Sequence, residues 1–263
     1  MAHHLPLGVS LAGLPEKPGA PWAGGPRSAI GWAGAAGFPA VQLDAAAPGL
    51  RPRELDRSAR RDVASILRRC GLSFCGLDLW VPAPHYADPA RAERALEAAL
   101  SAIALAADLA SLAGEPGAAI VALTLPDSGS ARDHLAKEAE LRGVSIADHA
   151  PPTADAAPAA RGSIGVGIDP AATLMRGLDP AAAALRVVPS LVQARLSDAG
   201  DLGRSPVGAG RLDLPAYIAA LVAAGYARAV VLDLRALPDP AAAAQAAASA
   251  WPGSFAATRG SVK

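Results

Sequence analysis

Short apolar runs alternate with longer segments of helical periodicity along most of the chain. In one such segment, Leu214, Ile218 and Leu221 recur at the spacing of a helical face, and a glycine follows the last turn. Val230–Leu232 is then a short β-branched run that ends at Asp233. A helix that leads into a buried strand is half of a βαβ unit, so this pattern predicts a parallel sheet.

The same unit repeats through the sequence. Strands are predicted at residues 5–11, 40–44, 73–79, 118–125, 144–148, 164–169, 190–197 and 230–233. Helices are predicted at 28–36, 58–70, 88–112 with Asp88 as its cap, 130–142, 171–175, 180–185, 214–222 and 240–250. Residues 150–162 are rich in Pro and Ala and show no clear period.

Eight strands alternating with helices favour a single (β/α)8 TIM barrel spanning residues 1–263, in which the fifth helix is weak or missing. Residues 251–263 are expected to form a tail. A doubly wound open sheet is the alternative, but no Gly-x-Gly-x-x-Gly follows the first strand.

Charge, hydropathy and cysteine content limit the partners and the compartment expected for this protein. The 24 Lys and Arg residues balance 24 Asp and Glu residues, so no basic face is indicated, and neither nucleic acid nor an anionic membrane is expected as a partner. The longest apolar run, Ala98–Ala107, is flanked by charges and too short to span a bilayer. The N-terminus carries no signal-peptide pattern, and two cysteines favour a reduced, cytoplasmic chain.

Alternation along the strands places polar side chains on the inner face of the barrel. Gln193, Arg195 and Ser197 share one face of their strand, opposite apolar neighbours. Barrel active sites lie at the carboxyl ends of the strands. Spacing alone therefore predicts a polar ring at this end, made of Gln42, Asp44, Asp78, Asp148, Asp169, Arg195 and Asp233.

Segments in the right order resemble the xylose isomerase-like TIM-barrel family, the sugar phosphate isomerase/epimerase group. The most specific are Val-Gly-Ala-Gly-Arg-Leu-Asp-Leu at 207–214 and Ala-Ala-Gly-Tyr at 223–226. Weaker matches lie at 36–43, 88–111, 164–170 and 191–198, so the resemblance covers nearly the whole chain. It implies a small sugar or keto-sugar substrate, free or phosphorylated, and a divalent metal (Mg, Mn or Zn). In that family the metal polarises the substrate while carboxylates move a proton between adjacent carbons.

The resemblance is incomplete at the family's metal ligands, which are two Glu, an Asp and a His. Asp148 and Asp233 stand where the family has Glu, Asp169 is retained, and Arg195 replaces the His. Gln42 stands at the position of a further Glu. By resemblance, Asp148, Asp169 and Asp233 are the expected metal ligands and catalytic carboxylates.

Three interpretations of this ring are open. In the first, the three aspartates still hold Mg²⁺ or Mn²⁺ through oxygen, with His149 as a further ligand. In the second, Arg195 supplies the positive charge of the metal within an ion-pair network, and the barrel is a non-catalytic one that binds an anionic small molecule or a protein partner. In the third, the aspartates merely cap loops and helices. The third is favoured for Asp44 and Asp78, and the second for Asp169, Arg195 and Asp233.

Other polar residues are expected to contact the substrate. These candidates are Gln42, His85, Arg195 and Asp198. Backbone N–H groups at Gly208–Gly210 are a candidate phosphate cradle, although an ordinary flexible loop explains the sequence equally well. An endonuclease of related barrels is disfavoured, because the chain has only five His and no net charge.

Overall fold

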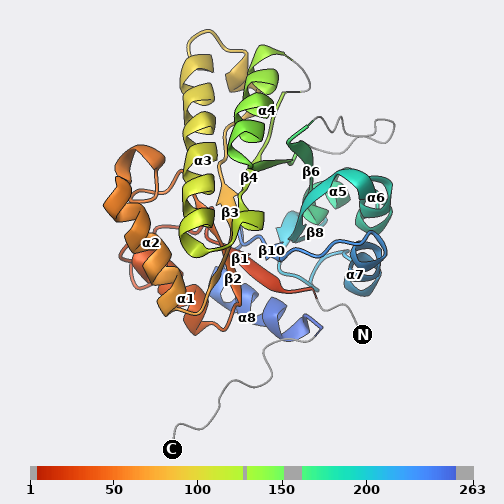
Figure 1. The fold of residues 1–263 in the computed structure, drawn as a ribbon. Coiled ribbons are helices and arrows are strands. Elements are labelled where there is room, and N and C mark those ends of the chain that lie inside the picture. The colour runs from red at the N-terminus through yellow and green to blue at the C-terminus, as the bar shows by residue number, and fades with distance from the viewer. Residues whose placement is uncertain (1–4, 127–128, 151–161, 253–263) are drawn as a thin grey trace, which may run out of the picture.

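The computed structural model describes residues 5–126, 129–150 and 162–252. Parallel strands close into a barrel in chain order, and the last strand pairs with the first (Figure 1), which confirms the predicted TIM barrel. The barrel strands are β1 (Leu7–Ser10), β2 (Ala40–Asp44), β3 (Ser73–Asp78), β4 (Ile120–Leu123), β5 (Ser145–Asp148), β6 (Ile164–Ile168), β7 (Leu191–Leu196) and β10 (Val230–Leu232).

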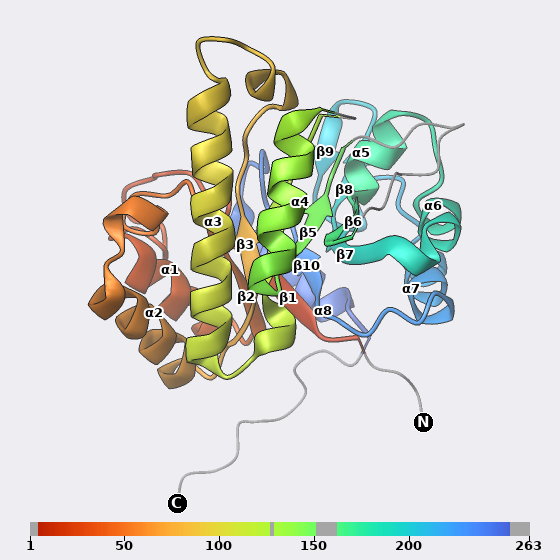
Figure 2. The same cartoon turned by 45° about the horizontal axis from the view of Figure 1, so that its top comes forward.

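Helices surround the barrel, and Figure 2 shows α3 and α4 running side by side along one flank. The α-helices are α1 (Pro26–Ala35), α2 (Arg57–Arg69), α3 (Ala92–Ala113), α4 (Ser130–Arg142), α5 (Pro170–Met175), α6 (Pro180–Arg186), α7 (Leu214–Ala223) and α8 (Pro240–Ala250). Short 3-10 turns are η1 (Pro52–Glu54), η2 (Ala83–Tyr86), η3 (Pro116–Ala118) and η4 (Val188–Ser190). Most of the stretch predicted as a weak fifth helix, at 151–161, lies outside the described residues.

Asp-Pro pairs set the start of several helices. Asp169, Asp179 and Asp239 each accept a hydrogen bond from a backbone N–H in the first turn, and a proline follows each of them. The aspartate satisfies a donor that has no partner within the helix, and the proline supplies a φ angle suited to the first turn. The sequence therefore determines these helix starts locally.

The third helix begins later than predicted. The Asp88 side chain accepts the N–H of Ala90 in a local turn, and its carbonyl accepts the N–H groups of Arg91 and Ala92. An aspartate that closes such a turn competes with its own role as a helix cap. The prediction that Asp88 caps this helix is therefore wrong, and α3 begins at Ala92.

Helix α3 is also longer and more apolar than the run at Ala98–Ala107 suggests. Its length and composition would suffice to cross a membrane, but 44% of its apolar window is buried. It packs against α2, α4 and the adjacent barrel strands, largely through alanines. These contacts are those of a core helix in a folded barrel.

Two further differences lie near the carboxyl end of the chain. Trp251, which was assigned to a tail, is buried, and its indole N–H donates to the carbonyl of Leu5 at 2.8 Å. The remainder of that tail, 253–263, lies outside the described residues. After β7 the chain forms an antiparallel hairpin, β8 (Asp198–Gly200) with β9 (Gly203–Ser205), which the strand pattern did not predict.

Candidate functional site

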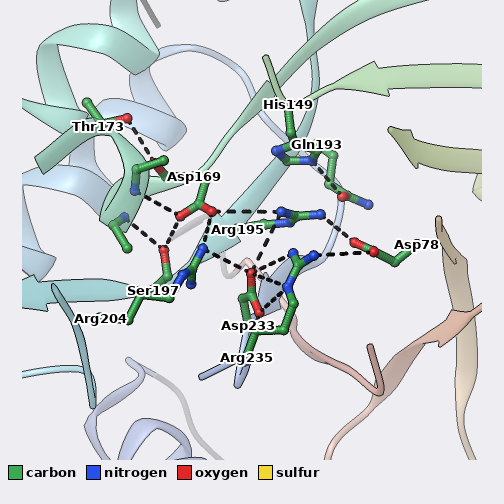
Figure 3. Close-up of polar contacts among 12 residues, drawn as sticks. Asp78, His149, Asp169, Thr173, Gln193, Arg195, Ser197, Arg204, Asp233 and Arg235 are labelled. Atoms are coloured by element: carbon green, nitrogen blue, oxygen red, sulfur yellow. Dashed lines mark hydrogen bonds and ion pairs between the residues drawn. The ribbon is translucent and has the colours of Figure 1, made fainter. Parts of the chain in front are cut away.

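The side chains of three aspartates and three arginines lie together where the barrel strands end (Figure 3). We call this set the ion-pair cluster, and its members are Asp78, Asp169, Asp233, Arg195, Arg204 and Arg235. The ends of β3, β6, β7 and β10 and the strand β9 bring them together. Because parallel strands end at one face of a barrel, residues far apart in sequence meet here.

Arg195 is the central cation of the cluster. Its guanidinium donates to Asp78, and its Nη1 lies 3.8 Å from Asp169 Oδ2 and 3.7 Å from Asp233 Oδ2. The expected ion-pair network around Arg195 is thus present. The assignment of Asp78 to a loop cap is wrong, because the closed barrel turns the end of β3 toward β7.

Arg235 forms a close pair with Asp233. Its Nε lies 3.0 Å from Asp233 Oδ1, and its Nη2 lies 2.7 Å from Oδ2. Burial favours the neutral acid, but the charges of Arg235 and Arg195 outweigh it and hold the pKa of Asp233 well below its usual value. Asp233 is therefore ionised and already neutralised by protein cations.

Arg204 reaches the cluster from the β8–β9 hairpin. Its Nη2 contacts Asp169 Oδ2 and lies 3.4 Å from Asp233 Oδ2. The other oxygen of Asp169 accepts the hydroxyl of Ser197 at 2.6 Å and the N–H of Ala172 at 3.3 Å. Asp169 is consequently fixed by Arg204, Ser197 and Ala172, in addition to its ion pair with Arg195.

The cluster is buried unevenly. The side chains of Asp78, Asp169 and Asp233 are between 0% and 9% exposed, and that of Arg195 is 7% exposed. The side chains of Arg204 and Arg235 are 18% and 21% exposed. A molecule that approaches this end of the barrel therefore meets guanidinium groups before it meets carboxylates.

A neutral polar group lies behind the cluster, inside the barrel. Gln193 Oε1 is 3.1 Å from His149 Nε2 (Figure 3). The same oxygen accepts a hydrogen bond from Gln42 Nε2 at 3.2 Å. Burial, and then the charge of Arg195, lower the pKa of His149 well below its usual value, so its ring is neutral. Gly167 makes room for that ring, since a Cβ there would lie 2.4 Å from Nε2.

Asp148 is not part of this cluster. One of its oxygens accepts the N–H groups of Leu125 and Ala150, and the other lies 2.6 Å from Arg132 Nη1. Its carboxylate is thereby fixed against α4 and the loop after β4. Asp148 thus pairs with Arg132, whereas Asp169 and Asp233, the other two expected metal ligands, pair with arginines of the cluster.

Asp198 binds the backbone of its own loop. Its two oxygens accept four N–H groups, which belong to Ala199, Gly208, Gly210 and Leu212. The two glycine N–H groups of the candidate phosphate cradle therefore already have an internal carboxylate as their partner. The prediction that Gly208–Gly210 form a phosphate cradle is therefore wrong, because Asp198 occupies these donors.

His85 lies in η2, with its Nε2 2.8 Å from a nitrogen of Arg91. Asp44 accepts the N–H of Ala46 in a turn after β2, as the loop-cap interpretation expects.

Two members of the ion-pair cluster were not predicted as site residues. Arg235 follows Asp233 at the two-residue spacing of a strand face, which is a usable signal, whereas Arg204 depends on an unpredicted hairpin.

The cluster does not have the chemistry of a metal site. Within the described ranges, no group of three or more His, Cys, Asp or Glu side chains could hold a metal ion. The oxygens of Asp169 and Asp233 face guanidinium groups, and a fixed guanidinium cannot lose its charge. The residues present therefore do not fit the divalent metal that the resemblance implies.

Comparison with solved structures identifies the fold. No family model and no curated protein sequence matches the chain. A xylose isomerase domain protein from Planctomyces limnophilus superposes with a TM-score of 0.68 at 17% identity, over 94% of this chain and 95% of that chain. The 3-keto-D-glucoside 4-epimerase from E. coli gives 0.68 at 16% identity, over 93% and 98%.

A third neighbour was solved in complex with magnesium. It is a xylose isomerase-like TIM barrel protein from Mycobacterium smegmatis, with a TM-score of 0.62 at 15% identity, over 92% of this chain and 94% of that chain. At these identities the likeness establishes the fold, and the chemistry has to be argued from the residues of the site.

Proposed function

We propose that this protein, which has the fold of the xylose isomerase-like TIM barrels, binds an anionic sugar at the carboxyl end of its barrel. The observation that carries this proposal is the uneven burial of the cluster, in which Arg204 and Arg235 are the most exposed members. A sugar phosphate and a sugar acid share the anionic oxygens that a guanidinium binds with paired hydrogen bonds.

The carboxylates of the cluster fix both guanidinium groups before a ligand arrives. Arg235 is bound to Asp233 through two nitrogens, and Arg204 contacts Asp169 and Asp233. A side chain that is already ordered loses little conformational entropy on binding. The three positive and three negative formal charges cancel, so an anionic ligand is held by local donors and not by net charge.

The other candidate, an isomerase or epimerase with a metal at Asp148, Asp169 and Asp233, has weaker support. Its support is the sugar chemistry named for the structural neighbours, such as L-ribulose 3-epimerase. Against it, Asp148 is bound to Arg132, and the other two carboxylates are bound to cluster arginines. We therefore assign no proton-transfer step to these three aspartates.

The remaining substrate-binding candidates are assigned from their contacts. Arg195 and Gln42 are buried: Arg195 pairs with the carboxylates of the cluster, and Gln42 donates to Gln193. Asp198 binds its own loop, and His85 contacts Arg91. Arg204 and Arg235 thus become the principal ligand-binding residues of the proposal.

Titration calorimetry with fructose 6-phosphate, gluconate and inorganic phosphate tests this proposal. We expect binding to the wild-type protein, weakened roughly 10-fold or more by Arg204→Gln or Arg235→Gln, since each removes a charge-assisted donor. Arg61→Gln, which changes an exposed arginine on α2, is the matched control and should bind like wild type. Equal binding by all variants, or no binding of any probe, would refute the proposal.

Metal dependence is tested on the same samples. Since the residues do not fit a divalent ion, we expect EDTA to leave the affinity for each probe unchanged. Mn²⁺ titrated into the protein should give no binding heat. One bound Mn²⁺ per chain that is lost in Asp169→Ala would instead restore the metal-dependent candidate.

A further inference from the structure

A pocket of about 630 Å³ lies beside the ion-pair cluster, between the loop after β1 and the loop after β2. Most of its wall is formed by Leu, Pro, Gly and Ala, and the side chains used below are those of Trp22 and Asp44. The exposed Glu16 and Lys17 also border it. Its volume lies within the range of pockets that enclose small molecules.

Trp22 gives this pocket a fixed aromatic wall. Its indole N–H donates to the carbonyl of Pro15 at 2.8 Å. Its ring packs edge-on against Trp32, with 5.1 Å between the ring centres and 69° between the planes. Trp22 is 8% exposed, so an indole held by both contacts offers the pocket a small, ordered apolar surface against which part of a sugar ring can pack.

Asp44 places a carboxyl group within this mostly apolar wall. Its Oδ1 accepts the N–H of Ala46 at 2.8 Å, which orients the side chain at the end of β2. Burial raises the pKa of Asp44, and the charge of Asp78 adds to that effect against opposing backbone hydrogen bonds. A half-buried carboxyl group that retains acceptor capacity is suited to accept hydrogen bonds from ligand hydroxyls.

Gly13 connects the pocket to the cluster. It lines the pocket, and a Cβ at this position would lie 2.1 Å from Cγ of Arg235. The backbone of Gly13 therefore packs directly on the Arg235 side chain, and the charge of Arg235 also acts on Asp44, a second residue of the pocket wall. The pocket thus adjoins Arg235, one of the two arginines proposed to bind the anion.

We infer that this pocket holds the sugar ring of the anionic ligand whose charged group is bound by Arg204 and Arg235. Ring hydroxyls donate to the carboxyl group of Asp44, and an apolar face of the ring packs against Trp22. This inference rests on the proposed function, because the cluster supplies the anionic end of the same site. It adds that the protein selects an anionic sugar over the bare anion.

The affinities for fructose 6-phosphate and for inorganic phosphate distinguish the pocket assignment from the proposed function, which is anion binding by the cluster. We expect the wild-type protein to bind the sugar phosphate more tightly than phosphate. Asp44→Asn should weaken sugar-phosphate binding roughly 10-fold relative to phosphate binding, since it changes a partner of the ring hydroxyls, whereas the loss of its charge near Arg235 acts on both probes alike. Glu93→Gln, which changes an exposed carboxylate on α3 outside the pocket, is the matched control and should leave both affinities unchanged.

Each outcome decides one of the two statements. If both probes bind and Asp44→Asn does not change their relative affinity, the pocket assignment is wrong and the proposed function stands. If neither probe binds the wild-type protein, the proposed function fails and the pocket assignment fails with it. Gly13→Ala provides a second check, because displacing Arg235 should weaken both probes together.

Discussion

Arg195 shows how one residue determines what the barrel mouth can do. Three aspartates converge on it, and they are almost fully buried. Carboxylates this close repel one another in a medium of low dielectric unless cations lie between them. The guanidinium of Arg195 supplies that charge permanently, because it does not lose its proton.

Replacing Arg195 tests this role directly. Arg195→Met leaves buried carboxylates short of a cation, and we expect the free energy of unfolding to fall by about 3–5 kcal/mol. Arg27→Met removes an exposed ion pair with Asp62 and should cost less than about 1 kcal/mol. Urea unfolding measures both, and similar losses in the two variants would contradict a central role for Arg195.

His149 makes stability depend on pH. Its pKa in the folded protein is well below its usual 6.5, so the unfolded chain binds a proton more readily than the folded one. The neutral ring of His149 therefore leaves the free energy of unfolding undiminished above about pH 6.5. Below that pH the unfolded chain takes up the proton, and the free energy of unfolding falls by up to about 1.4 kcal/mol per pH unit.

Urea unfolding between pH 5 and 8 measures the effect of His149. In His149→Gln the loss below pH 6.5 should be smaller than in wild type, whereas His134→Gln, an exposed position on α4, should keep the wild-type slope. Other titrating groups are common to these proteins and cancel in the comparison. Parallel curves for wild type and His149→Gln would show that protonation of this ring does not affect folding.

Strand alternation located some residues of the site and failed for others. It placed Asp169, Arg195 and Asp233 on one inner face, because a two-residue period and a closed barrel are sufficient to bring them together. It also grouped Asp148 with them, since strand ends carry no information about which way a side chain turns. The nearby Arg132 on α4 decides that direction, and this contact is not visible in the strand pattern.

Among the strands of the described residues, β8 and β9 are those that sequence reasoning missed. The hairpin that they form has short strands, and its position depends on Asp198 accepting four backbone N–H groups from the hairpin and the loop that follows. Such a contact spans up to 14 residues and produces no periodic pattern. The helices that begin at Asp-Pro pairs are the opposite case, since their caps are encoded within a few residues.

Removing the Asp198 carboxylate should loosen this loop selectively. In Asp198→Ala the N–H groups of Gly208, Gly210 and Leu212 lose their acceptor, and we expect their hydrogen exchange to accelerate about 10-fold or more. Amides of α3 should keep their protection. Asp201→Asn, an exposed change within the same hairpin, is the control. Unchanged exchange in Asp198→Ala would mean that the loop is held by other contacts.

At the scale of the whole molecule, the sequence predicts the barrel better than it predicts the site. Each strand and helix has a local signal, and their alternation is sufficient to imply closure. The cluster depends on closure itself, because Asp78 and Arg235 are 157 positions apart and meet only when β10 returns to β1. The register of the closing strands therefore determines the contacts that sequence spacing could not supply.

Trp251 contributes to this closure from the end of α8. Its ring is 3% exposed, and its N–H donates to Leu5, just before β1. Trp251→Ala should therefore lower the free energy of unfolding by about 3–5 kcal/mol, through lost burial and a residual cavity. Trp80→Ala, at a side chain that is 68% exposed, should change it by less than about 0.5 kcal/mol. Urea unfolding of the two variants gives the comparison. A loss in Trp251→Ala no larger than in Trp80→Ala would show that the barrel closes without this contact, through the pairing of β1 with β10 and β2 alone.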